Sequence, residues 1–250
     1  MKNNSNTTAI ILAAGFGSRI STLTTNPKSL LKIKYQSLLE RHLSSLKDCN
    51  IRDVIVVTGY KEEMILNEIK KHQSTLNIKT IFNEHFKNTG NSWSLYLALS
   101  QVKDKTLIID ADLCYEVCIL KSFLEADEDN TFLCGDVSIE DIECSKVLVD
   151  HESCVRVIAD KRAVTPEELN NLQFVGEAVG MIKLDHPMVC ALNELMQKTF
   201  EDPVEKKTNW ERIFNLFIAQ YPMGFTKTNS KKWIEIDTQE DYTLALRMFE

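Results

Sequence analysis

The sequence has 250 residues, a formal net charge of −7 and 44% hydrophobic residues, which is enough for one large or two small domains with a core. The negative charge argues against binding to nucleic acid or an anionic membrane, and no stretch has the pattern of a membrane span or signal peptide. The seven cysteines form an odd set without CxxC pairs, so we expect a cytoplasmic protein with free, mostly buried thiols and no membrane insertion.

The first predicted element is a strand that ends in a glycine-containing turn. We expect residues 1–8 to be disordered. Residues 9–12 form an apolar run of strand length, and small residues follow it, so the backbone of the turn is open to close approach by a ligand. Backbone amides together with Arg19 and Lys28 are suited to a nucleoside triphosphate. A simple tight turn is the alternative, and the spacing matches neither the P-loop nor the dinucleotide motif.

The following residues alternate between helical and strand patterns. Apolar residues recur at helical spacing over 38–46, and 54–57 is a β-branched run typical of a strand buried on both faces. Residues 61–72 have the pattern of a surface helix, and 78–82 that of a third strand. This rhythm predicts an α/β fold with right-handed crossovers and a doubly wound, mostly parallel, Rossmann-like sheet.

Polar residues follow two of these predicted strands. The loop 83–92 leads into a helix at 93–99, and Asn88 or Asn91 could read a pyrimidine edge there, although such residues also simply form loops and caps. The apolar run 107–109 ends in Asp110 and Asp112. Two carboxylates at the carboxyl end of a strand predict a Mg²⁺ site, with an aspartate-rich turn as the alternative. Asp112 lies nearer the strand exit.

The second half of the chain is predicted to be richer in β-structure. Residues 146–160 read as a hairpin, 174–184 as a strand and 187–200 as a helix. A helix begins near 208, and a final strand at 233–236 ends in Asp237. No low-complexity tract or linker divides the chain. We therefore expect a single domain over 1–250, with a small β-rich acceptor-binding lobe at roughly 140–185.

The segment LAAGxGSR, with PKSL after it, resembles the signature of nucleotidylyltransferases that activate sugar phosphates and phosphocholine. The resemblance implies that the turn holds the base and phosphates, that Arg19 meets the leaving pyrophosphate and that Lys28 meets the transferred phosphate. Thr22 departs from the family, which often has proline there. The implied nucleotide-binding residues in this segment are Leu12, Ala13, Ala14, Gly15 and Gly17.

Two later segments extend the resemblance. Residues 91–98 are similar to the NNxxSLYLA stretch of bacterial CTP:phosphocholine cytidylyltransferases, and we add Asn88, Asn91, Ser94 and Asp110 to the predicted nucleotide site. The segment WxEIDTxxDY resembles the closing motif of the same family, although Thr238 and Asp241 also resemble a capping box with Asp in place of the usual Glu or Gln. In that family the aspartate is the second metal ligand. The resemblance therefore implies a Mg²⁺ ion between Asp112 and Asp237.

The acceptor site is predicted from fewer residues. Lys161 lies near the place where sugar-transferring relatives have a lysine on the acceptor phosphate, although it could be a surface residue. Trp210 and Glu211 resemble an aromatic–acidic pair for a cationic head, with a hydrophobic staple as the alternative. Lys146 stands where choline-specific relatives carry tryptophan, which favours an anionic or zwitterionic acceptor. Tyr115 and Glu177 complete the predicted lining of this pocket.

Together these features predict Mg²⁺-dependent transfer of a nucleotidyl group, CMP from CTP, to a small phosphorylated or phosphonate acceptor such as phosphocholine, with release of pyrophosphate. We expect a monomer or a homodimer. Three alternatives remain open: a sugar-1-phosphate nucleotidylyltransferase, a glycosyltransferase with a DxD metal site, and a nucleotide-binding regulatory subunit. The regulatory subunit would be expected to lack one of the charged residues at Arg19, Lys28, Asp112 and Asp237, and all four are present.

Overall fold

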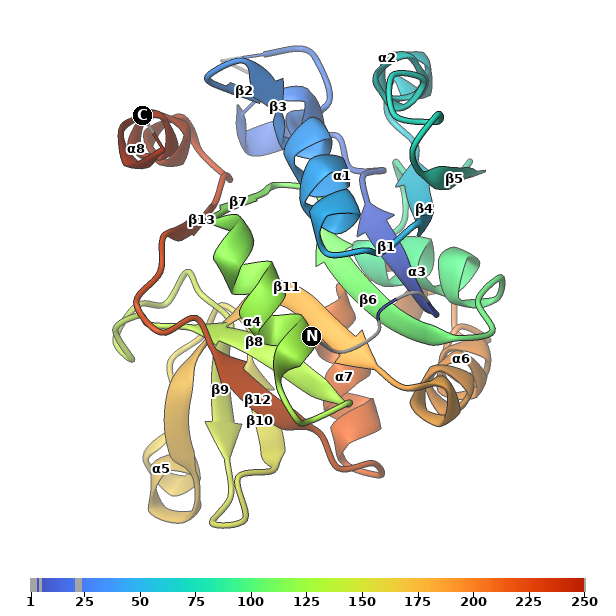
Figure 1. Ribbon diagram of the computed structural model, residues 1–250. Coiled ribbons are helices and arrows are strands. Elements are labelled where there is room, and N and C mark those ends of the chain that lie inside the picture. The colour runs from blue at the N-terminus through green and yellow to red at the C-terminus, as the bar shows by residue number, and fades with distance from the viewer. Residues whose placement is uncertain (1–3, 5, 21–23, 250) are drawn as a thin grey trace.

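The computed structural model describes residues 4, 6–20 and 24–249 and shows a mixed α/β fold around one large sheet (Figure 1). Within these residues the sheet has nine strands. Seven lie in the order β10-β9-β11-β6-β1-β4-β5, while β8 pairs with β11 and β12 pairs with β8. The strands of this sheet are β1 (Thr7–Leu12), β4 (Asp53–Thr58), β5 (Asn77–Phe82), β6 (Lys105–Asp110), β8 (Thr131–Gly135), β9 (Lys146–Val149), β10 (Val155–Ala159), β11 (Gln173–Leu184) and β12 (Gly224–Lys227).

Helices and two small two-stranded sheets complete the fold. The α-helices are α1 (Leu38–Asp48), α2 (Glu62–Ile69), α3 (Asn91–Leu99), α4 (Val117–Glu125), α5 (Pro166–Asn171), α6 (His186–Thr199), α7 (Trp210–Ile218) and α8 (Gln239–Met248). The short 3₁₀ turns are η1 (Ser18–Ile20), η2 (Lys28–Leu30) and η3 (Glu205–Lys207). The small sheets pair β2 (Lys32–Ile33) with β3 (Gln36–Ser37), and β7 (Leu113–Tyr115) with β13 (Trp233–Glu235).

The strands β6, β1, β4 and β5 run parallel to one another, which confirms the predicted doubly wound, mostly parallel sheet, while β6 pairs antiparallel with β11 on its other side. Their β-branched side chains alternate between two apolar cores, because successive residues of a strand face opposite sides. Ile10 and Ile108 pack on one face with α3, α6 and α7. Ile11 and Ile109 pack on the other face with α1, α2 and α4. Helices therefore cover both faces, and the carboxyl ends of the strands remain free for a site.

Strand β11 joins the parallel half of the sheet to the β-rich half. Glu177 pairs with both β8 and β9, and Ile182 pairs with both β8 and β6. Strands β6 and β9 therefore lie one after the other along the same edge of β11, opposite β8. The predicted hairpin is present as β9 and β10, and it extends the central sheet rather than forming a sheet of its own.

Regular structure begins closer to the N-terminus than we expected. Thr7 and Thr8 already belong to β1 and pair with Lys105 and Thr106 of β6, so predicted disorder through residue 8 is wrong for these two residues. Residues 1–3 and 5 lie outside the described residues. So does Thr22, where the sequence departs from the family motif. All seven cysteines are free, and Cys49, Cys114, Cys134 and Cys144 are buried.

None of the helices in the described ranges combines the length and apolar character that a membrane crossing requires.

Gly180 is needed where β11 passes the end of β6. Its φ is +71°, and a Cβ at this position would lie 2.7 Å from Oδ2 of Asp110. We expect Gly180→Ala to lower the free energy of unfolding by about 1–3 kcal/mol, from left-handed strain and this contact together. Urea denaturation measures the effect. Gly15→Ala is the control, because a Cβ there would meet nothing within 4 Å; equal stability of the two variants would contradict the assignment.

Candidate active site

A cavity of about 250 Å³ lies where the carboxyl ends of β1 and β6 meet β11. Its walls come from the glycine-containing turn after β1, the loop after β5, the middle of β11, β13 with the residues after it, and the start of α7. A smaller cavity of about 140 Å³ adjoins it and is lined by the same turn and Lys28. The site thus lies at the sheet edge where the sequence predicted it.

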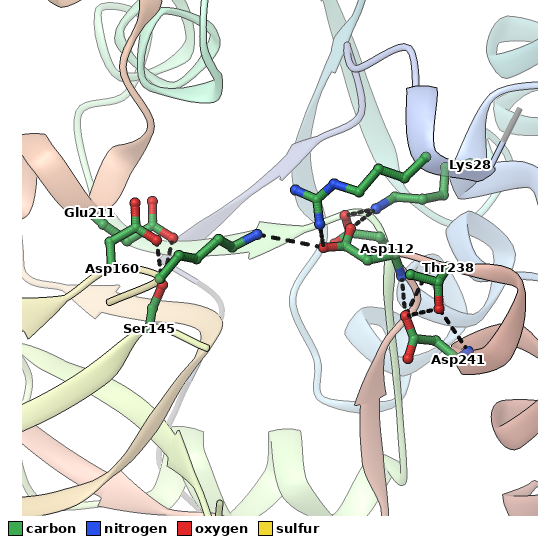
Figure 2. Close-up of polar contacts among 10 residues, drawn as sticks. Lys28, Asp112, Ser145, Asp160, Glu211, Thr238 and Asp241 are labelled. Atoms are coloured by element: carbon green, nitrogen blue, oxygen red, sulfur yellow. Dashed lines mark hydrogen bonds and ion pairs between the residues drawn. The ribbon is translucent and has the colours of Figure 1, made fainter. Parts of the chain in front are cut away.

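Lys28 is the cation at the centre of the site. Its Nζ lies 2.6 Å from Oδ2 of Asp112 and 2.6 Å from Oδ1 of Asp237, and Figure 2 shows Lys28 beside Asp112. Arg19 Nη1 donates to Oδ2 of Asp237 at 2.8 Å. Burial alone would lower the pKa of Lys28, but the two aspartates raise it above its ordinary value. Burial would likewise raise the pKa of Asp237, whereas Lys28 lowers it, so this pair is ionised.

The position of Asp237 is set by a strand and a helix cap. Strand β13 pairs antiparallel with β7, and the N–H of Ile236 then donates to the carbonyl of Asp112 at 3.1 Å. Helix α8 starts immediately afterwards with a capping box between Thr238 and Asp241, which Figure 2 shows below Asp112. The Asp241 carboxylate also accepts from the backbone N–H of Asp237 at 3.0 Å. The two predicted metal ligands are therefore brought together by backbone contacts.

Asp112, Glu235 and Asp237 form a cluster that fits a hard divalent cation. Each offers a carboxylate oxygen, and these oxygens lie within 4.8 Å of one another. Oδ1 of Asp112 is buried and has no hydrogen-bond partner among the described residues. Burial, and then the neighbouring aspartates, raise the pKa of Glu235 well above its ordinary value. Glu235 was not predicted, although it lies two residues before Asp237 and so on the same side of an extended segment.

The predicted nucleotide turn lines both cavities. Leu12, Ala14 and Gly15 contribute to the larger cavity, and Ala13 and Gly17 contribute to the smaller one. Gly17 has a φ of +65°, and a Cβ there would lie 3.3 Å from Cβ of Lys28. A glycine therefore allows the turn to pass close to this lysine.

In the loop after β5, the asparagine that faces the cavity is not the one that we predicted. Asn88 is exposed and lies outside the lining of the cavity, so the structure gives no support to its predicted contact with the nucleotide; its N–H donates to the carbonyl of His85 within the turn. Asn83 lines the cavity instead. It is buried, and Nδ2 donates to Oγ of Ser94 at 3.0 Å and to Oγ1 of Thr89 at 3.1 Å. As the first residue after β5, Asn83 could have been found by the strand-end rule that identified Asp110.

Asn91 and Ser94 both line the cavity, as predicted. Oδ1 of Asn91 accepts from the backbone N–H of Trp210 at 2.8 Å, so Asn91 also caps the start of α7. Ser94 faces the cavity from α3 and is held by Asn83.

Trp210 lies in the wall of the cavity but cannot offer its ring to a cation. It is only 2% exposed, and its ring packs on Phe132 and Phe214. Its Nε1 donates to Oδ2 of Asp110 at 2.9 Å. The predicted aromatic role is therefore wrong, because the core covers the faces of the ring. Burial and the Asp112 carboxylate raise the pKa of Asp110. The hydrogen bond from Trp210 lowers this pKa and so partly offsets the rise.

Two other predicted acceptor residues point away from the cavity. Tyr115 is buried in the core on the α1 side, where its hydroxyl lies 3.2 Å from Nδ1 of His42. Lys146 is fully buried, and its Nζ donates to the carbonyl of Arg162 at 2.9 Å. Both predictions are wrong, and for Lys146 the reason is strand alternation, since the neighbouring Ser145 faces the cavity.

Lys161, Glu177 and Glu211 do line the cavity. Lys161 Nζ lies 3.7 Å from Oδ2 of Asp237. Burial raises the pKa of Glu177 and that of Glu211 to about 7, and nearby carboxylates (Asp141 and Asp160, respectively) add to the effect. This end of the cavity is therefore acidic and partly desolvated.

Comparison with known proteins agrees with this geometry. Residues 9–163 match the MobA-like NTP transferase domain. The chain belongs to this nucleotidyltransferase family.

Its relatives include an Aquifex aeolicus protein named bifunctional IPC transferase and DIPP synthase, which is 28% identical over 243 residues, or 95% of this chain and 50% of that protein. The choline-phosphate cytidylyltransferase of Haemophilus influenzae is 41% identical over 106 residues, or 42% of this chain and 43% of that protein. The chain thus spans about half or less of the length of these curated relatives. The solved CTP:phosphocholine cytidylyltransferase of Streptococcus pneumoniae superposes with a TM-score of 0.77 at 20% identity, covering 98% of this chain and all of that one, which shows a shared fold.

The raised pKa of Glu211 has a consequence for stability. The folded state keeps this proton up to a pH of about 7 and the unfolded state loses it near 4.5, so the stability that this group contributes is lost as pH rises through this window. We expect Glu211→Gln to remove about 1–3 kcal/mol of the fall in unfolding free energy between pH 5 and pH 8. Urea denaturation at the two pH values measures it.

Glu63→Gln is the matched control, because Glu63 is exposed on α2. It should keep the pH dependence of the wild type. A Glu211→Gln variant with the same pH dependence as the wild type would show that this carboxyl is ionised in the folded state.

Proposed function

We propose that this chain catalyses Mg²⁺-dependent transfer of CMP from CTP to the phosphate or phosphonate oxygen of a small acceptor, with release of pyrophosphate. The observation that carries the proposal is the contact of Lys28 with Asp112 and Asp237 beside the glycine-containing turn. A relative named choline-phosphate cytidylyltransferase supports CTP as the donor and phosphocholine as an example of the acceptor.

The donor would lie between the turn after β1 and the loop after β5. Asn83 uses both N–H groups of its amide on Thr89 and Ser94, and its Oδ1 accepts from the N–H of His85 at 3.0 Å. Its role is therefore to orient the two hydroxyls rather than to touch the base itself. Thr89 Oγ1 donates its own proton to the carbonyl of His85 at 3.0 Å, so Ser94 is the hydroxyl that can donate to the edge of a pyrimidine.

The reaction needs no side-chain nucleophile, because the acceptor oxygen is already anionic at neutral pH. The residues of this chain bring that oxygen in line with the α-phosphorus of the nucleotide and offset the charge that builds as pyrophosphate leaves. Lys28 and Arg19 supply positive charge at the carboxylate cluster, and Lys161, also near Asp237, supplies it for the phosphate of the acceptor. Asp112, Glu235 and Asp237 would hold Mg²⁺, which when bound polarises phosphate oxygens.

The test combines the purified protein, Mg²⁺ and each of the four common NTPs with a panel of phosphorylated acceptors, while pyrophosphate is followed. We expect CTP to be preferred and a phosphorylated amine to be turned over. Preference for glucose-1-phosphate would instead favour a sugar-1-phosphate nucleotidylyltransferase. Nucleotide binding without pyrophosphate release from any pair would favour a regulatory subunit.

The two aspartates provide the first mutational test. We expect Asp112→Asn and Asp237→Asn each to lower kcat by at least about 100-fold, because each removes a charged ligand from a divalent cation. Thermal unfolding in the absence of Mg²⁺ should show that both variants remain folded. A variant with nearly the wild-type rate at saturating Mg²⁺ would remove that residue from the metal site.

Lys28→Ala tests the role of the central cation. Its charge matters most when the phosphorus is attacked, so we expect kcat to fall by about 100-fold or more, with a smaller change in the dissociation constant of CTP. Steady-state kinetics and equilibrium binding separate the two effects. A raised KM with an unchanged kcat would limit Lys28 to substrate binding.

A further inference from the structure

Carboxyl groups gather at the acceptor end of the cavity, and among the described residues none of them forms an ion pair with a cation. Ser145 Oγ lies within hydrogen-bonding distance of two carboxyl groups, 3.0 Å from Oδ1 of Asp160 and 3.2 Å from Oε1 of Glu211, and its single proton can be donated to one of them at a time. Figure 2 shows these three residues as a group apart from Lys28 and Asp112. Glu211 is 9% exposed, and its Oε2 is buried with no hydrogen-bond partner among the described residues. Glu143 and Glu177 line the same end.

Such a group of carboxylates is costly without a counter-charge. A buried carboxyl oxygen without a hydrogen-bond partner loses its hydration with no compensating contact. Here that unfavourable free energy falls on a residue in the wall of a cavity. Burial raises the pKa of both Glu177 and Glu211 to about 7, so a positive ligand would bind here as these groups ionise.

A short distance from this acidic end, the wall of the cavity carries a positive charge. Lys161 directly follows Asp160 and adopts a left-handed backbone with a φ of +45°. Its Nζ lies 3.7 Å from Asp237 in the carboxylate cluster, whereas Asp160 hydrogen-bonds with Ser145. Two consecutive residues thus offer a cation toward the phosphate end and an anion toward the acceptor end. This arrangement matches a short zwitterion that carries phosphate or phosphonate at one end and an ammonium group at the other.

The wall also indicates which kind of ammonium group fits. Aromatic faces bind quaternary ammonium, but within the described lining the aromatic residues are Phe86, on the nucleotide side, and Trp210, whose ring is covered by the core. The acidic end offers hydrogen-bond acceptors instead, namely the Glu211 carboxylate and the Ser145 hydroxyl. An N–H group can use these acceptors, and a trimethylammonium group cannot.

We propose that the acceptor carries a protonated primary amine, which Glu211 and Ser145 bind through N–H hydrogen bonds and which the site prefers to a quaternary ammonium. The inference rests on the proposed function, because it places this amine at the acceptor end of that same site. It makes Glu211 and Ser145 the residues that determine acceptor specificity.

The first test is equilibrium binding of a methylation series to the wild-type protein without Mg²⁺, so that binding is measured without turnover. The probes are 2-aminoethyl phosphate, its N-methyl and N,N-dimethyl derivatives, and phosphocholine. We expect the dissociation constant to rise along the series by about 10- to 100-fold in total, with the largest step at the loss of the last N–H. Phosphocholine that binds as tightly as 2-aminoethyl phosphate would overturn the proposal.

The second test uses Glu211→Gln, which keeps the shape of the side chain and removes its charge. We expect it to weaken binding of 2-aminoethyl phosphate by about 10- to 100-fold, to reduce the difference from phosphocholine, and to leave the dissociation constants of CTP and of the amine-free probe ethyl phosphate unchanged. Glu63→Gln, on exposed α2, should match the wild type with every probe. Equal weakening of ethyl phosphate and 2-aminoethyl phosphate would also overturn the proposal.

The binding order and the pyrophosphate assay separate this inference from the proposed function. If the methylation series gives the expected order but none of the nucleotide and acceptor pairs releases pyrophosphate, the proposed function fails and the amine site stands. If CTP and phosphocholine react and phosphocholine binds more tightly than the primary amine, the proposed function stands and the amine site fails. The wild-type series also decides the question should Glu211→Gln not fold.

Discussion

The site depends on one electrostatic constraint, which is that several carboxylates share a few cations. Asp110, Asp112, Glu235 and Asp237 converge at one edge of the sheet, and Lys28 contacts two of them directly. Removing charges from water is costly unless they are paired, so such a cluster is stable only with positive charge nearby. The same constraint makes the cluster suitable for a divalent cation, which adds positive charge, and Lys28 and Arg19 can then bind the phosphates of a nucleotide.

The architecture of the sheet brings this cluster to the acceptor. Strands β6 and β9 share one edge of β11, so Asp110 at the end of β6 and Ser145 at the start of β9 face a common cavity. Helix α7 closes that cavity through adjacent residues with different tasks: Trp210 holds Asp110, and Glu211 holds Ser145. A single helix start thus joins the nucleotide end to the acceptor end.

The residues that could be predicted are those set by short sequence patterns. Arg19 and Lys28 follow a strand and a glycine-containing turn, and Asp112 follows the predicted strand 107–109, so the strand-end rule indicated one edge of the sheet. The role of Asp237 was implied by the resemblance of its segment to the closing motif of the nucleotidylyltransferases, because β13 belongs to a separate antiparallel pair. Tyr115, Lys146 and Trp210 were placed wrongly because their roles depend on which face of an element the tertiary core covers. That choice depends on distant partners such as Phe132, His42 and the carbonyl of Arg162.

Other residues were missed although the sequence contained a usable signal. Asn83 is the first residue after β5, and Glu235 is the last residue of β13, two positions before Asp237. Applying strand alternation and the strand-end rule to every strand would have identified both. Specific contacts, such as the hydroxyls that Asn83 orients, still require the structure, because they join residues from a loop and a helix.

The pairing of β7 with β13 also has a consequence for the order in which the protein assembles. The hydrogen bond from Lys28 to Asp237 joins residues 209 positions apart, whereas the parallel strands β1 and β4 pair residues 45 positions apart, such as Thr8 and Asp53. Closing so long a loop costs more chain entropy and contributes late to folding. The residues next to β13 and in α8, Ile236 and Ala245, belong to a third, smaller core, so an intermediate can bury the two larger cores while β13 is still undocked. That species would be compact but catalytically silent, so activity would return after the fluorescence and circular dichroism signals of the core during refolding.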